Sequence, residues 1–366
     1  MEQDPGWLAI LGAEPGRSVA SFSLGQGTQE RVVPFLVHPS RLQYRLGEST
    51  LFSLPVRRHV LVGEPDLGAA GGGAASLTAL LRALREGLQG NDVVFLQSIP
   101  VAGPLHRALT ASADVRRDYH VIPHGAAYQH RRAAFEGSHV AYLASLRRST
   151  RRDLRRSRRK FEARTGGRHE VRCFTTETEV VQFLEEASGI SEGTYQCRLL
   201  GLGLRDTPCM RTRLRSAARK GWLRAYILYA EGRPIAFQLG YLHRTTYYAE
   251  DTGYAPDWSK CHAGVFLLTE MLADLAPVAD VFDFLDGDDL LKSRLGNRSR
   301  LEQSFYLVPR TLRGGLIAHS LRGINALSAG LGALFARVRL KESLRRMLRA
   351  RSVARTTLGG TPPATA

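Results

Sequence analysis

The sequence is poor in cysteine, and the four cysteines among its 366 residues do not lie in a metal-binding pattern. Cys173, Cys197, Cys209 and Cys261 form no C-x-x-C pair and show no zinc-ligand spacing. We therefore expect neither a bound metal nor a disulfide framework. Reduced thiols are typical of a protein in the cytosol.

Long apolar runs are also missing, since the sequence contains no uninterrupted apolar window of eighteen residues. Its start, Met1-Glu2-Gln3-Asp4-Pro5, lacks a basic leader followed by an apolar stretch. These features predict neither export nor a membrane span, so we expect a cytoplasmic protein. Neither a Walker P-loop nor a G-x-G-x-x-G turn is present.

Acidic residues are scarce relative to basic ones. There are 51 lysines and arginines against 34 aspartates and glutamates, which gives a net charge of +17 and a pI near 10.3. Such a charge attracts polyanions, here nucleic acid, anionic lipid or a phosphorylated small molecule. The excess is mostly arginine in a chain rich in alanine, glycine and leucine, so a biased coding composition explains it equally well.

The pattern along the first half of the chain changes from β to α/β and then to a long helix. Short β-like runs fill the first 65 residues, and a glycine-rich joint, Gly68 to Gly73, precedes a leucine-striped helix and a buried strand. From Ala141 a long arginine-rich helix runs to Gly166-Gly167. The length and these changes predict two lobes and an appendage.

The second half contains the most regular stretch. Three strands joined by tight turns, Leu223–Ala230, Ile235–Leu242 and Thr246–Gly253, predict an antiparallel meander. A helix from Gly264 to about Leu275 and a strand, Asp280–Leu285, follow. This order predicts an α+β fold with a mixed sheet.

Four blocks of sequence, taken in order, resemble a known family. They are Arg147 to Glu162, Gly232-Arg233-Pro234-Ile235-Ala236, Ala263 to Leu268, and Phe282 to Gly296. Together they resemble the GNAT-superfamily acyltransferases of the cellulose-biosynthesis CelD/BcsL type, which are relatives of the Fem peptidyltransferases. The resemblance spans about 150 residues and implies an acyltransferase enzyme.

The resemblance implies tandem GNAT-like lobes with mixed central sheets. We expect a degenerate N-terminal lobe at residues 1–139 and a C-terminal acyltransferase lobe, beginning with the arginine-rich helix, at residues 140–310. Residues 311–366 then form a basic amphipathic helical segment that ends in a disordered tail. This segment either lies on an anionic membrane surface or packs as a helical hairpin, because its glycines break any long helix.

The family pattern also implies a donor site for acetyl-CoA or another acyl-CoA as co-substrate. In such enzymes the start of the helix after the meander holds the pyrophosphate, which here corresponds to Lys260, Cys261, His262, Ala263 and Gly264. A helix N-terminus suits an anion because its first N–H groups are free. The pantetheine arm would lie where the strands Thr246–Gly253 and Asp280–Leu285 separate.

Direct transfer in a ternary complex requires a base near the acceptor. The carboxylates on or beside the separating strands are Glu250, Asp251, Asp283 and Asp288, and strand alternation allows at most one of Glu250 and Asp251 to face the cleft. We predict Asp283, Lys292 and Glu250 as the catalytic residues. Leu291 and Leu295 stand where relatives commonly have aromatic residues, so we expect either a different acceptor pocket or a loss of activity.

Three functions remain open. The first is transfer from acyl-CoA to an amine or hydroxyl of a sugar or a cell-surface polysaccharide precursor. The second is a Fem-like transferase that uses aminoacyl-tRNA, with the arginine-rich helix on the tRNA backbone. The third is a non-enzymatic accessory protein of a membrane polysaccharide synthase, in peripheral contact with the inner membrane.

Overall fold

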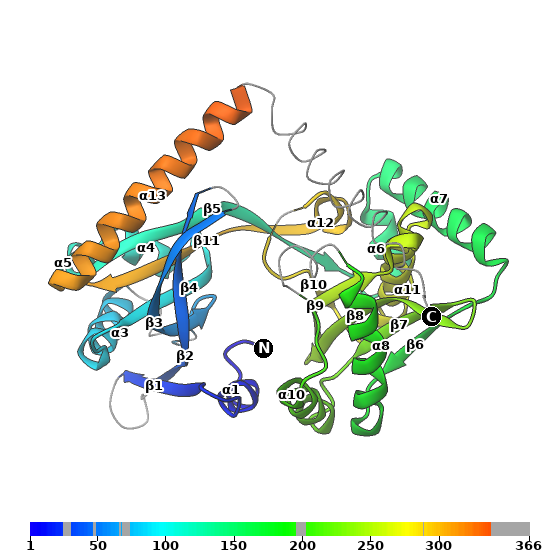
Figure 1. Cartoon of the computed structure of the whole chain (residues 1–366), viewed down its shortest axis with the longest axis horizontal. Helices are drawn as coiled ribbons and strands as arrows, with labels where there is room; N and C mark the ends of the chain where they lie inside the picture. The colour runs from blue at the N-terminus through cyan, green and yellow to red at the C-terminus, as the bar shows by residue number, and fades with distance from the viewer. Residues whose placement is uncertain are drawn as a thin grey trace, which may run out of the picture.

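The computed structural model describes residues 1–24, 31–46, 49–65, 67, 74–194, 203–287 and 289–337. These residues form a single mixed sheet of eleven strands in the order β1-β2-β3-β4-β11-β5-β10-β9-β8-β7-β6 (Figure 1). The strands are β1 (Ser18–Leu24), β2 (Arg31–Leu46), β3 (Ser49–Val62), β4 (Asp92–Pro100), β5 (Tyr119–Ala134), β6 (His169–Phe174), β7 (Ala225–Ala230), β8 (Arg233–His243), β9 (Thr246–Tyr254), β10 (Val281–Asp283) and β11 (Arg298–Pro309).

Helices cover both halves of this sheet, and none of the described helices is long and apolar enough to cross a membrane. They are α1 (Pro5–Gly12), α3 (Ala74–Gly87), α4 (Pro104–Ala111), α5 (Ala113–Asp118), α6 (His139–Ser145), α7 (Arg148–Thr165), α8 (Val180–Glu192), α10 (Pro208–Arg219), α11 (Ala263–Leu275), α12 (Leu290–Leu295) and α13 (Leu312–Arg337), with the short 3₁₀ helices η2 (Glu177–Glu179) and η3 (Pro256–Cys261).

The two halves of the sheet repeat one arrangement. In the first half, β3 and β4 are parallel neighbours joined through α3, and in the second half β9 and β10 are parallel neighbours joined through α11. Each pair begins after an antiparallel meander. The predicted α+β fold of two similar lobes with mixed sheets is therefore confirmed.

The lobes are joined through β5 and β11. The first part of β5 pairs with β11 in the N-terminal lobe, while its last residues, Arg132 to Ala134, pair with β10 of the C-terminal lobe. Two further elements pack against the lobe to which the predicted boundaries do not assign them. Strand β11 lies between β4 and β5 instead of in the C-terminal lobe, and α1 packs against α10 of that lobe.

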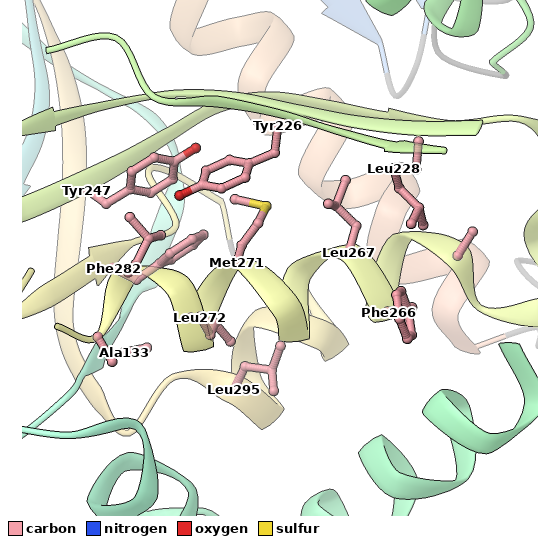
Figure 2. Packing of buried hydrophobic residues seen from close by; sticks show 14 of the residues in the cluster. Ala133, Tyr226, Leu228, Tyr247, Phe266, Leu267, Met271, Leu272, Phe282 and Leu295 are labelled. Atoms are coloured by element: carbon pink, nitrogen blue, oxygen red, sulfur yellow. The ribbon is translucent and has the colours of Figure 1, made fainter. Parts of the chain in front are cut away.

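Helix α11 forms the centre of the largest core cluster, between the sheet and helices α6, α7 and α12. Figure 2 shows Met271 pointing toward Tyr226 and Phe282 under the sheet, while Leu272 lies on the side of Leu295. Phe161 of α7 stacks on Phe266 at a ring-centroid distance of 4.2 Å. This packing fixes both ends of the segment that connects β9 to β10.

Sequence signals for the start and end of helices agree with the helix ends in the structure. Helix α7 ends at Gly166, whose φ of +57° favours glycine, and the predicted capping box at Thr176 and Glu179 is present. We predicted that glycines break any long helix in the C-terminal segment. This prediction is wrong, because α13 runs unbroken from Leu312 to Arg337. The predicted glycine-rich joint and the predicted disordered tail lie outside the described residues.

Candidate active site

Strands β9 and β10 separate in the middle of the C-terminal lobe. Their parallel pairing covers only three positions and ends at Tyr248 and Asp283. Strand β9 continues to Tyr254 beside β8, whereas β10 ends and Leu285 adopts a left-handed conformation with φ of +55°. Among the described residues, β9 therefore has no strand partner on that side after Tyr248.

A β-bulge lies on β9 just beyond this point. Leu239 pairs with Asp251 and Gly240 pairs with Ala249, which leaves Glu250 as the extra residue. The Glu250 carboxylate accepts a hydrogen bond of 2.7 Å from the Arg213 guanidinium on α10. Glu250, which we predicted to be catalytic, is thus held in an ion pair on the α10 side of the sheet.

Asp251 is the carboxylate beside the bulge that no described cation binds. Its Oδ1 accepts one hydrogen bond of 2.8 Å from the Thr252 N–H, and burial raises its pKa to about 6. At neutral pH such a group is ionised and still able to accept a proton. From the sequence we identified Asp251 as a carboxylate on the separating strands. Strand alternation alone did not show whether Asp251 or Glu250 faces the cleft.

Asp283, the first predicted catalytic carboxylate, belongs to a buried charge network at the lobe junction. His130 of β5 donates to Asp283 Oδ1 at 2.6 Å through Nε2 and to Glu302 Oε2 at 2.8 Å through Nδ1. Arg132 Nε donates to Asp283 Oδ2 at 2.9 Å, and Arg300 donates to Glu302. We call these residues the junction network: Arg132, Asp283, His130, Glu302 and Arg300.

Charges within the junction network are mutually dependent. Because both ring nitrogens of His130 face carboxylates, the ring must donate from both and be an imidazolium. Burial alone would lower the pKa of His130, but the bonds to Asp283 and Glu302 outweigh it and raise the pKa to about 9. Burial is likewise outweighed at Asp283, where the bond from His130 lowers the pKa. Asp283 is thus a poor base and a good anchor for the end of β10.

Lys292 lies on α12, whose N-cap is Asp289. Its Nζ donates to the backbone oxygen of Asp286 at 2.6 Å, which ties the turn after β10 to the helix. Among the described residues Lys292 and Asp283 form neither a hydrogen bond nor an ion pair with each other. Leu291 is partly exposed, whereas Leu295 is buried and packs in the α11 cluster.

The predicted phosphate-binding residues surround the start of α11. His262 occupies the N-cap position with φ of +60° and makes no side-chain capping bond, and the first intrahelical bond there is from Phe266 N–H to His262 O. The N–H groups of residues 263–265 thus precede the hydrogen-bonded turns. The side chains of Lys260 and His262 are exposed, while Cys261 and Ala263 are buried and anchor the turn.

Helix α7 adds a positively charged surface. Five exposed arginines follow one stripe of this helix, at spacings of three, four and seven, and none of them pairs with a described carboxylate: Arg148, Arg152, Arg155, Arg156 and Arg159. By contrast, Arg151 and Arg158 beside the stripe bind backbone oxygens of α6 and Glu270 respectively. We call the five residues the arginine stripe, which spans about 16 Å.

A cavity of about 710 Å³ lies between α1 and α10. Ala9, Ile10, Pro208 and Thr212 are among its lining residues, and Arg213, which binds Glu250, lies at its wall. The described residues contain no group of three or more His, Cys, Asp and Glu side chains that could hold a metal ion.

Comparisons with known proteins agree with this arrangement. Residues 148–293 match the family model of an acetyltransferase (GNAT) domain. The crystal structure of FemX is 11% identical with a TM-score of 0.54, and the match covers 82% of this chain and 94% of FemX. The C-terminal DUF2156 domain of a protein described as a lysylphosphatidylglycerol synthetase from Agrobacterium fabrum is 11% identical with a TM-score of 0.51, covering 88% and 93%. No curated protein matches the sequence.

These matches support the coarse predictions. The match of residues 148–293 to a GNAT acetyltransferase domain supports an acyltransferase enzyme, and the fold of the chain is like that of FemX and of the DUF2156 domain. The alternative of a non-enzymatic accessory protein is therefore set aside. Both structural neighbours lie far below 25% identity, so they support the fold and leave the donor and acceptor open.

Proposed function

We propose that this enzyme is an acyltransferase of the CelD/BcsL type. It transfers an acyl group from acetyl-CoA or another acyl-CoA to an amine or hydroxyl of a sugar or cell-surface polysaccharide precursor in the cytoplasm. One observation carries the proposal, namely that β9 separates from β10 directly beside the uncapped start of α11, within the residues that match the GNAT domain.

The residues around α11 fit the phosphates of the donor. The N–H groups of Ala263, Gly264 and Val265 lie at the positive end of a thirteen-residue helix, with the exposed side chains of Lys260 and His262 beside them. Gly264 leaves space there, since a Cβ atom would lie 3.1 Å from the Tyr254 ring. The thioester, when bound, supplies the activated acyl group.

Asp251 is the base that the geometry favours for the acceptor. An acceptor amine that enters from the α10 side can lose its proton to the Asp251 carboxylate, directly or through water, because a pKa of about 6 suits proton transfer near neutral pH. The Glu250 carboxylate is instead bound to the Arg213 guanidinium, which makes it a weaker base. Asp283 and Lys292 serve the reaction by fixing the end of β10 and the following turn.

Calorimetric titration with acetyl-CoA and with longer acyl-CoAs tests the donor directly. We expect binding to the wild-type protein and at least tenfold weaker binding to Gly264→Val, whose branched side chain meets Tyr254. Gly189→Val is the matched control, because Gly189 lies in a helix with nothing within 4 Å of its Cβ position. Absence of donor binding at millimolar concentration would refute the proposal.

A second candidate donor, aminoacyl-tRNA, is favoured by the arginine stripe. Five unpaired guanidinium groups along about 16 Å of helix can bind successive phosphates of a folded RNA. In this case tRNA binding must weaken steeply with salt, and the triple variant Arg152→Gln/Arg156→Gln/Arg159→Gln must reduce both affinity and salt dependence. Salt-insensitive binding, or none, argues against this donor.

A further inference from the structure

Helix α13 lies along the N-terminal lobe and has two very different faces (Figure 1). One face is packed, with Ile317, Ala318 and Leu321 buried in a cluster with residues of β2, β4 and β11. Ser320 donates a hydrogen bond of 3.0 Å to the Tyr44 hydroxyl, and the Arg322 guanidinium reaches the backbone oxygen of Val121. The helix is thus firmly seated on the sheet.

The opposite face presents leucines to solvent. Leu312 is 95% exposed, Leu316 is 75% exposed and Leu327 is 54% exposed. At 100° per residue these three side chains fall on one stripe, which we call the leucine ridge and which spans about 22 Å. Aligned apolar side chains of this size on a seated helix indicate a contact surface, whereas single exposed leucines need no explanation.

The charge beside the leucine ridge decides which partner fits. Residues 310–327 contain Arg310, Arg313 and Arg322 and no acidic residue, and the whole chain carries +17. Arg310 and Arg313 are exposed and form no ion pair with a described residue. A second copy docked ridge to ridge would bring these arginines together, whereas an anionic bilayer offers apolar chains beneath negative headgroups.

We propose that α13 docks the enzyme on the surface of an anionic membrane. Leu312, Leu316 and Leu327 enter the boundary between headgroups and acyl chains, and Arg310 and Arg313 bind the lipid phosphates at its edge. The helix lies flat on the surface. This inference does not depend on the identity of the acyl donor.

Co-sedimentation of the full chain with lipid vesicles tests the proposal. We expect binding to vesicles of phosphatidylcholine with about one quarter phosphatidylglycerol, and weak binding to phosphatidylcholine alone. Leu312→Glu/Leu316→Glu should lower the partition coefficient at least tenfold. Val140→Glu/Val278→Glu is the matched control, because these valines are 77% and 45% exposed elsewhere and receive the same charges.

A second pair of variants separates the two contributions. Arg310→Gln/Arg313→Gln should weaken binding to the anionic vesicles and reduce its salt dependence, with little effect on the residual binding to phosphatidylcholine. The proposal is overturned if wild-type protein does not bind anionic vesicles, or if the valine control loses as much binding as the ridge variant. It is also overturned if the ridge variant instead dissolves a wild-type dimer seen by analytical ultracentrifugation.

Discussion

The junction network should make the stability of this protein fall above neutral pH. His130 has a pKa of about 9 in the folded chain against 6.5 for a free histidine, because both its nitrogens donate to buried carboxylates. The folded pKa is the higher one, so the contribution is fully present below about pH 6.5 and is lost as pH rises through 9. The difference corresponds to about 3 kcal/mol of unfolding free energy.

Urea unfolding between pH 6 and pH 10 measures this contribution. We expect the free energy of unfolding to decline mainly between about pH 6.5 and pH 9. The pKa values of His59, His120, His139 and His243 are lowered, so these groups titrate below this window. Burial lowers the pKa of the Met1 amino group from 8.0, which gives a rise in stability that opposes the early part of the decline, so the contribution of His130 is the difference between the wild type and His130→Gln. His130→Gln should be destabilised at pH 6 and should lack the decline. His319→Gln, an exposed histidine on α13, should keep it.

A different outcome would refute this account of the network. If the unfolding free energy of the wild-type protein stays constant from pH 6.5 to pH 9.5, His130 does not carry the proton that both carboxylates require. If His130→Gln shows the same decline as the wild type, another group is responsible. In either case the anchoring of β10 through Asp283 would have to rest on Arg132 and on the Leu285 N–H, which donates to Asp283 Oδ1 at 2.8 Å.

Three further predictions concern single positions. Asp251→Asn should lower kcat by about two to four orders of magnitude and should remove the rise of kcat/KM with pH near 6. The control Glu250→Gln should keep that rise, and steady-state kinetics measured against pH tests both expectations. Gly240→Ala should lower the unfolding free energy by about 3 kcal/mol or more, since the added Cβ overlaps the Tyr247 hydroxyl and lies 2.6 Å from the Tyr248 oxygen; urea titration with Gly189→Ala as control tests this. Phe161→Ala should cost about 3–5 kcal/mol because this fully buried ring stacks on Phe266, and an unchanged melting temperature would contradict the packing described for α7.

The features that the sequence predicts correctly are those encoded by neighbouring residues. The end of α7 at Gly166 and the capping box at Thr176 depend on a few residues each, and the meander follows from tight turns. The insertion of β11 between β4 and β5 depends on pairing between segments about 170 to 210 residues apart, such as Glu302 with Tyr128 and with Pro100. Local periodicity carries no information about such partners.

The candidate site shows the same limit. His130 is separated from Asp283 by 153 positions and from Glu302 by 172, so only the folded sheet reveals that they form one network. A charged residue within a strand is the only sequence signal that singles them out. The prediction that Glu250 and Asp251 face opposite sides assumed unbroken strand alternation. The bulge at Glu250 interrupts this alternation between these two carboxylates.

A comparison of the two lobes explains why the reaction is assigned to the second one. In the N-terminal lobe the parallel strands β3 and β4 also part, after Val62 and Gln97, but side chains of the chain itself fill that position. The Gln3 amide donates to the backbone oxygens of Val62 and Glu64 at 2.6 and 2.8 Å, and the Glu64 carboxylate accepts from the Leu105 N–H at the start of α4. At the equivalent position in the C-terminal lobe the Met1 amino group donates to the Tyr248 hydroxyl at 3.2 Å, but this lobe also has an uncapped helix start and a carboxylate with a raised pKa. The C-terminal lobe therefore differs from its counterpart in its uncapped helix start and in its carboxylate with a raised pKa, while the N-terminal lobe supplies His130 and Glu302 to the junction network.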